Sequence, residues 1–167
     1  MMNVMEAILK RRSIRAFTDE QVPDEAVERL LEAARWAPSG GNRQFWRFIE
    51  VRDSRRLDMI KMFSAGLKGD PTLIIAICSK ITEPLNLLDL GMASENIMLE
   101  AVELGLGSCA IASYSEGPVK QLLEIPDEME LVLLLSMGYP GESPKRRPKK
   151  PLNEIAFSEK FGEGFSS

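Results

Sequence analysis

Two clusters of positive charge are the side chains of this sequence best suited to chemistry. One surrounds Ser13 near the N-terminus, and the other lies in the proline-bounded stretch 144–151. Their cationic members are Arg11, Arg12 and Arg15 in the first cluster and Arg146, Arg147, Lys149 and Lys150 in the second. Either cluster alone is typical of a solvated protein face. A guanidinium group can donate two hydrogen bonds to the oxygens of one phosphate, so the two clusters together could clamp one phosphate.

A glycine-rich turn beside two aromatic rings is the second feature that suggests a ligand. Residues 37–46 read APSGGNRQFW, between an apolar helix pattern and a strand pattern. One glycine or asparagine would supply the positive φ that a simple turn needs. The pair Gly40 and Gly41 therefore favours a backbone that a flat or bulky group approaches closely. An ordinary helix-to-strand connection is the alternative. A phosphate and a flat ring together are the requirements of flavin mononucleotide (FMN).

The residues that are absent narrow the chemistry further. The sequence has no histidine and only two cysteines, which excludes Ser-His-Asp and Cys-His nucleophiles, His-ligated metals and a Cys₄ zinc site. Cys78 and Cys109 are expected to be free thiols in the core. The pattern G-x-G-x-x-A in GLGSCA (105–110) lies between a helix and a following strand, the reverse of the dinucleotide-binding order. Catalysis must therefore depend on a cofactor, on carboxylates, or on Lys and Arg, with no metal expected.

Length and charge indicate one globular domain over 1–167, with 144–167 as an extended C-terminal arm. The net charge of -4 and the pI near 5.1 argue against a nucleic-acid partner. Neither a signal peptide nor a membrane span is evident, so we expect a cytoplasmic protein with no membrane partner.

Hydrophobic periodicity predicts helices alternating with strands. We expect helices over 3–11, 24–36 with Asp24 as N-cap, 53–63, 84–104 and 118–125, and strands over 46–51, 72–78, 107–112 and 130–139. The helix over 84–104 is apolar on nearly every side, so it must be buried on every side. In so small a domain a second subunit is the simplest cover, which predicts a homodimer.

Four blocks of the sequence resemble the nitroreductase family of FMN enzymes. They stand in the family's order: RRSIRAF (11–17), APSGGNRQFWRFIEV (37–51), LDLGMASENIMLEAVELGLGSCAI (88–111), and GYP (138–140) followed by RPKKPL (147–152). The resemblance implies an α+β, three-layer fold with a central mixed or antiparallel sheet flanked by helices. It also implies an intertwined homodimer that holds FMN at each of its two interfaces.

The same resemblance implies a set of flavin ligands. From one subunit they would be Arg11, Ser13 and Arg15, with Arg12 supporting through its backbone, the ring-edge residues Ala110, Ile111, Ala112 and Ser113, and the phosphate ligands Arg147 and Lys149. From the partner they would be Pro38, Ser39, Gly40 and Asn42, with Gln44 matching the family's N-x-Q-P-W motif, in which Phe45 here replaces proline.

The implied activity is transfer of hydride from NADH or NADPH through flavin N5 to a nitroaromatic, quinone or similar small-molecule acceptor by a ping-pong mechanism. No side chain would act as acid or base; Arg15 would stabilise charge on the ring, and Ser113 would present its N–H to N5. The alternatives are another reaction on the same fold, dehalogenation or flavin breakdown, or a flavin-free binding module that uses the basic arm. Relatives often carry a longer segment where this chain has only 61–72, so their substrate preference cannot be assigned to this chain.

Overall fold

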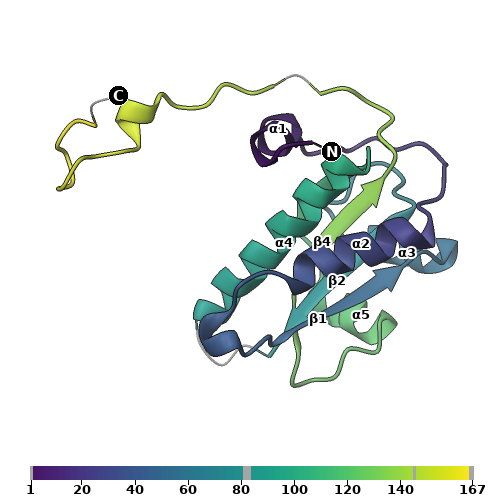
Figure 1. Ribbon diagram of the computed structural model, residues 1–167. Helices are drawn as coiled ribbons and strands as arrows, with labels where there is room; N and C mark the ends of the chain where they lie inside the picture. The colour runs from purple at the N-terminus through teal and green to yellow at the C-terminus, as the bar shows by residue number, and fades with distance from the viewer. Residues whose placement is uncertain (1, 81–83, 145, 166–167) are drawn as a thin grey trace.

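A four-stranded antiparallel sheet forms the centre of the molecule, with strand order β1-β2-β4-β3. The computed structural model describes residues 2–80, 84–144 and 146–165. Its strands are β1 (Trp46–Val51), β2 (Leu73–Ser79), β3 (Gly107–Ile111) and β4 (Glu130–Gly138). Figure 1 shows helices in front of and behind this sheet. The predicted α+β class and all four predicted strands are confirmed, and no strand end differs from its predicted position by more than one residue.

The described residues form five α-helices around the sheet: α1 (Val4–Lys10), α2 (Asp24–Arg35), α3 (Ser54–Met62), α4 (Leu85–Glu103) and α5 (Glu116–Leu122). Two 3₁₀ turns, η1 (Gly40–Asn42) and η2 (Leu152–Glu154), lie in the connections. Asp24 is the first helical residue of α2 and Pro23 its N-cap, so the predicted cap was wrong by one residue. Helix α5 starts two residues earlier than predicted, because Pro118 fits its first turn, where no helical N–H bond is lost, and it ends three residues earlier, at Leu122.

Burial on both faces of β2 explains the layered arrangement. All seven residues of β2 are buried, and alternate side chains enter two separate apolar clusters. Ile75 and Ile77 pack with α2 and α4 on one face, while Ile74 and Ala76 pack with α3 and α5 on the other. Cys78 and Cys109 are free and buried, as predicted, and desolvation raises the pKa of Cys78 to about 11.

Helix α4 is buried on one side only within the single chain. Leu90, Ala93 and Ile97 have exposures of 2% or less, whereas Leu88 is 62% and Met92 39% exposed. The predicted cover of the second side by a partner subunit stays a prediction. No helix in the described ranges is long and apolar enough to cross a bilayer.

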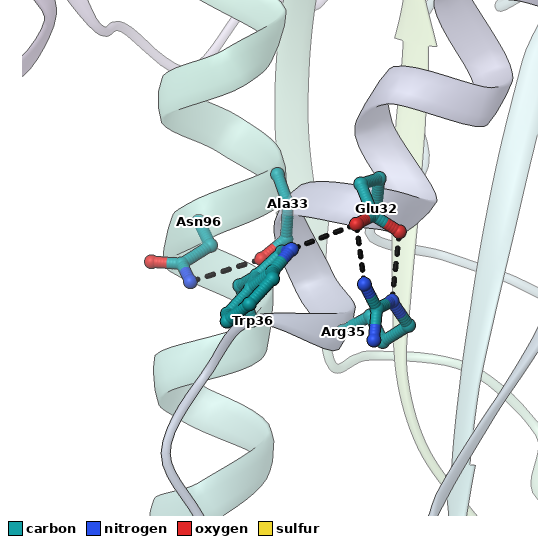
Figure 2. Close-up of polar contacts among 5 residues, drawn as sticks. All are labelled: Glu32, Ala33, Arg35, Trp36 and Asn96. Carbon is teal, nitrogen blue, oxygen red and sulfur yellow. Dashed lines mark hydrogen bonds and ion pairs between the residues drawn. The ribbon is translucent and has the colours of Figure 1, made fainter.

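Polar contacts fix the end of α2, where the glycine-rich turn begins (Figure 2). The amide of Asn96, on α4, donates to the carbonyl of Ala33 at 3.0 Å. The Trp36 indole N–H donates to the Glu32 carboxylate at 2.7 Å, and the Arg35 guanidinium bonds the same carboxylate at 2.5 and 2.7 Å. Arg35 also lies 5.0 Å from the Trp36 ring centroid, within cation–π range. Trp36, although 72% exposed, is therefore held in one orientation.

The Glu32 contacts should persist in acid conditions that protonate an ordinary glutamate. Hydrogen bonds from Arg35 and then from Trp36 lower the pKa of Glu32 from 4.5 to about 2. Because the folded-state pKa is the lower one, the stabilisation is present above the unfolded value and is lost as pH falls towards about 2. An NMR titration of the Glu32 carboxyl carbon should show the low midpoint, and Arg35→Ala should raise it. A parent midpoint at the ordinary value would contradict these contacts in solution.

Candidate functional site

One pocket of about 430 Å³ collects cationic side chains from both ends of the chain. Its N-terminal wall contains Arg11, Arg12, Ser13 and Arg15, and its C-terminal wall contains Arg146, Arg147 and Lys149. Lys150 is not among the lining residues. The structure therefore places the two basic clusters in one site, which is the arrangement that a phosphate clamp requires.

The sheet edge positions the N-terminal wall. The Ile14 N–H donates to the Ser108 carbonyl at 2.9 Å, and Ser13 forms a parallel bridge with Ser108 of edge strand β3. Ile14 is buried against Gly107, where an added Cβ would lie only 2.7 Å from the Ile14 side chain. With Ile14 inserted, the neighbours Ser13 and Arg15 face the opposite way, towards the pocket.

Two arginines of this wall already have partners. The Arg11 guanidinium lies 3.4 Å from the carboxylate of Glu95, which projects from α4 into the same pocket. The Arg12 guanidinium donates to the carbonyls of Leu9 and Arg11 at 2.8 and 2.6 Å, so it satisfies acceptors at the end of α1. An anion in the pocket would share Arg11 with Glu95. Arg12 would attract the anion mainly by its positive charge, because its guanidinium already donates to two backbone carbonyls.

The glycine-rich turn has an unusual backbone. Gly41, Asn42 and Gln44 all have positive φ, at 59°, 56° and 51°. The Gln44 N–H is held by the Ser39 hydroxyl at 3.2 Å. Gly40 has φ outside this region, and an added Cβ would meet nothing within 4 Å. No described residue of the same chain therefore requires glycine at position 40, while the Gly40 N–H donates to the Asp89 carboxylate at 3.2 Å.

The turn and the pocket contact different faces of α4. Asp89 holds the turn through Gly40, and Glu95 holds the pocket through Arg11. Six residues of α-helix separate these contacts by about 9 Å along the axis and roughly 120° around it. Figure 1 shows the turn after α2 at the start of α4 and α1 near the opposite end. Pro38, Ser39, Gly40, Asn42 and Gln44 are not in the pocket of their own chain.

The predicted ring-edge residues lie at the C-terminal end of β3 and directly after it. Ile111 is buried in the core beside α5, whereas Ala110, Ala112 and Ser113 are exposed and lie outside the basic pocket. The short segment 61–72 packs beside them, with the Gly66 N–H donating to the Ser113 carbonyl at 3.1 Å. At Gly69 the same segment lies against the Arg15 backbone. This segment thus contacts both stretches predicted to flank a flavin ring.

Sequence reasoning missed the acidic residues of the site. Asp89, Glu95 and Glu142 each contact a predicted site segment, at Gly40, Arg11 and Arg15 respectively. Asp89 could have been found as a carboxylate inside an apolar helix pattern. Glu95 and Glu142 look like ordinary surface glutamates in the sequence. Their partners, Arg11 and Arg15, are 84 and 127 residues away along the chain.

Comparisons with known proteins agree on one family. The model described as Nitroreductase family matches residues 8–72 and 59–139, which together exceed half the chain. A protein of Methanothermobacter thermautotrophicus that carries the provisional name NADH dehydrogenase/NAD(P)H nitroreductase is 36% identical over 157 residues, covering 87% of this chain and 82% of that protein. An iodotyrosine deiodinase of Thermotoga neapolitana is 28% identical over 173 residues, covering 87% of this chain and 91% of its own.

A solved structure shows the same fold over nearly the whole chain. It is an FMN-dependent nitroreductase from Clostridium difficile R20291, which superposes with a TM-score of 0.85 at 28% sequence identity. The match covers 93% of this chain and 99% of the other.

Replacing Gly69 with alanine should destabilise the folded chain. Its φ is +71°, and an added Cβ would lie 2.3 Å from the Arg15 carbonyl oxygen, so both backbone strain and a clash arise. We expect a loss of about 2 to 4 kcal/mol in the free energy of unfolding. The matched control is Gly117→Ala in α5, where an added Cβ meets nothing within 4 Å. Urea titrations that give both variants the same stability would contradict the packing of segment 61–72 on Arg15.

Proposed function

Because the chain belongs to the nitroreductase family, we propose that it is an FMN-dependent oxidoreductase that takes electrons from NADH or NADPH. A nitroaromatic, a quinone or a similar small molecule would be the acceptor. The observation that carries this proposal is a pocket in which basic side chains from both ends of the chain meet beside Ser13.

The donor set of this pocket fits the phosphate of FMN. Arg11, Arg147 and Lys149 supply charged donors, and the Ser13 hydroxyl adds a neutral one. A dinucleotide-binding glycine loop is missing from the sequence, which favours a mononucleotide over FAD. Arg15 lies at the same wall, so its guanidinium would place positive charge beside the ring once the phosphate is held.

When bound, FMN supplies hydride chemistry at N5, accepting from the nicotinamide and passing to the second substrate in ping-pong order. The protein's own residues have simpler tasks. Arg15 would stabilise negative charge at the pyrimidine edge, and the backbone N–H of Ser113 would face N5. Ala110, Ile111 and Ala112 would shape one edge of the site. No side-chain acid or base is needed, which suits a chain without histidine.

A homodimer would complete each site. The exposed apolar side chains Met5 and Ile8 of α1 and Leu88 and Met92 of α4 form surface that a second subunit would cover. In that dimer Pro38, Ser39, Gly40 and Asn42 would reach the partner's flavin, which gives Gly40 the close approach that its own chain does not require.

Reductive dehalogenation is the second candidate reaction. The iodotyrosine deiodinase relative covers most of the chain at 28% identity, so the fold accommodates that substrate elsewhere. The two candidates share FMN and differ in the second substrate. A steady-state screen of NADH and NADPH against nitroaromatic, quinone and halotyrosine acceptors separates them.

The flavin assignment is tested on the purified protein. It should be yellow and should release FMN, not FAD, on denaturation. Colourless protein that fails to bind added FMN in a fluorescence titration would contradict the proposal and would favour the binding-module alternative.

The same titration tests the phosphate clamp. Charged hydrogen bonds to phosphate contribute about 1.5 to 3 kcal/mol each, so Arg147→Ala or Lys149→Ala should weaken FMN binding roughly 10- to 150-fold. Lys150→Ala is the matched control, because Lys150 lies on the same arm outside the pocket lining. If Lys150→Ala weakens binding and Arg147→Ala does not, the arm meets the phosphate in another register.

A mixed dimer tests which subunit supplies the turn. One subunit carries Asn42→Asp, and the other carries Arg11→Ala with Arg15→Ala. If the turn serves the partner's flavin, both lesions fall on one site and about half of the parent activity per dimer remains, as expected for independent sites. If the turn serves its own flavin, each site carries one lesion and the mixed dimer stays impaired. Parent homodimer and the two mutant homodimers provide the reference activities.

A further inference from the structure

The carboxylate of Glu142 joins the two ends of the chain at the base of the basic arm. It accepts hydrogen bonds from the backbone N–H groups of Arg15 at 2.5 Å and of Ala16 at 3.1 Å. Consecutive N–H groups directed at one acceptor form an anion-binding concavity, here filled by a side chain of the same protein. The contact spans 127 residues of sequence.

Backbone pairing leads up to this contact and, among the described residues, does not pass beyond it. The Thr18 N–H donates to the Tyr139 carbonyl and the Gly141 N–H donates to the Ala16 carbonyl, both at 2.9 Å. Phe17 and Pro140 form an antiparallel bridge between these bonds. Residues 15–18 and 139–142 are the two paired segments. Among the described residues, the hydrogen bonds of the Glu142 carboxylate are the contact between them that lies nearest the arm. Pro144, Arg147 and Lys149 then line the pocket.

The charge of Glu142 alone would work against an anionic ligand. A carboxylate near a phosphate site repels the phosphate, so its presence beside Arg15 is explained better by what its oxygen accepts than by its charge. These hydrogen bonds hold residue 142 on the Arg15–Ala16 backbone, two residues before Pro144, the first arm residue that lines the pocket.

We propose that Glu142 is a positioning residue for the phosphate site: its carboxylate fixes the base of the arm to the Arg15–Ala16 amides, so that the two cationic walls meet across one ligand. This inference rests on the proposed function, since the ligand in question is FMN. Glu142 touches neither ligand nor reacting atoms in this role. It acts through Arg147 and Lys149.

The test compares Glu142→Ala with Glu142→Gln in FMN fluorescence titrations. Glu142→Ala removes both acceptor contacts and should weaken binding about tenfold. Glu142→Gln keeps a carbonyl oxygen that can accept both N–H groups and should bind within about twofold of the parent, since charge is not the essential property. Glu128→Ala, which removes an exposed carboxylate from the turn before β4, is the charge control and should match the parent.

A double-mutant cycle separates positioning from a general loss of stability. If Glu142 acts through Arg147 and Lys149, Glu142→Ala should weaken FMN binding less in the Arg147→Ala background than in the parent. Parent-like binding by Glu142→Ala would overturn the proposal, and so would equal weakening by the glutamine and alanine variants. Fully additive losses in the cycle would overturn it as well.

Amide hydrogen exchange on the cofactor-free protein keeps this inference apart from the proposed function. Glu142→Ala should speed exchange at the Arg15 and Ala16 amides, and Glu142→Gln should not. Parent protein that binds no FMN overturns the proposed function, and the phosphate role with it, even if these amides respond. Parent protein that binds FMN, with amides unchanged in Glu142→Ala, overturns the positioning role alone.

Discussion

Complete burial of β2 is the constraint on which the rest of this structure depends. A strand with both faces in the core needs a helical layer on each side and a strand on each edge. β1 and β4 pair with the two sides of β2, and β4 in turn pairs with β3. Strand β3 is therefore left at the margin of the sheet, where Ser108 can bind the incoming N-terminal segment through Ile14. The candidate site exists because the sheet ends there.

Helix α4 connects the other parts of the site. It covers one face of the sheet through Ala93 and Ile97, holds the turn through Asp89, and meets the pocket through Glu95. These tasks use different faces of one helix, which explains a sequence that is apolar nearly all round yet contains acids at particular positions. A helix committed only to packing would need neither carboxylate.

Local signals predicted most of the fold, and long-range contacts limited what could be predicted of the site. Periodicity placed the strand over 46–51 without error and α4 within a residue. The N-cap of α2 was misplaced, because proline and aspartate are both favourable near a helix start. Charge clustering predicted that basic side chains from both ends of the chain share one site, and Arg11, Arg15, Arg147 and Lys149 do line one pocket. It could not identify Glu95 or Glu142, whose partners are distant in sequence and whose surroundings look like any solvated surface.

The crowding of the basic pocket has an energetic consequence for the protein before any ligand arrives. Six cationic side chains line this pocket of about 430 Å³: Arg11, Arg12, Arg15, Arg146, Arg147 and Lys149. Among the described lining residues, Glu95 supplies the single negative charge. Like charges held so close raise the free energy of the empty fold. An anion bound there would relieve that repulsion in addition to making its own contacts. Part of its affinity would then come from electrostatic repulsion that is set when the two ends of the chain are brought together.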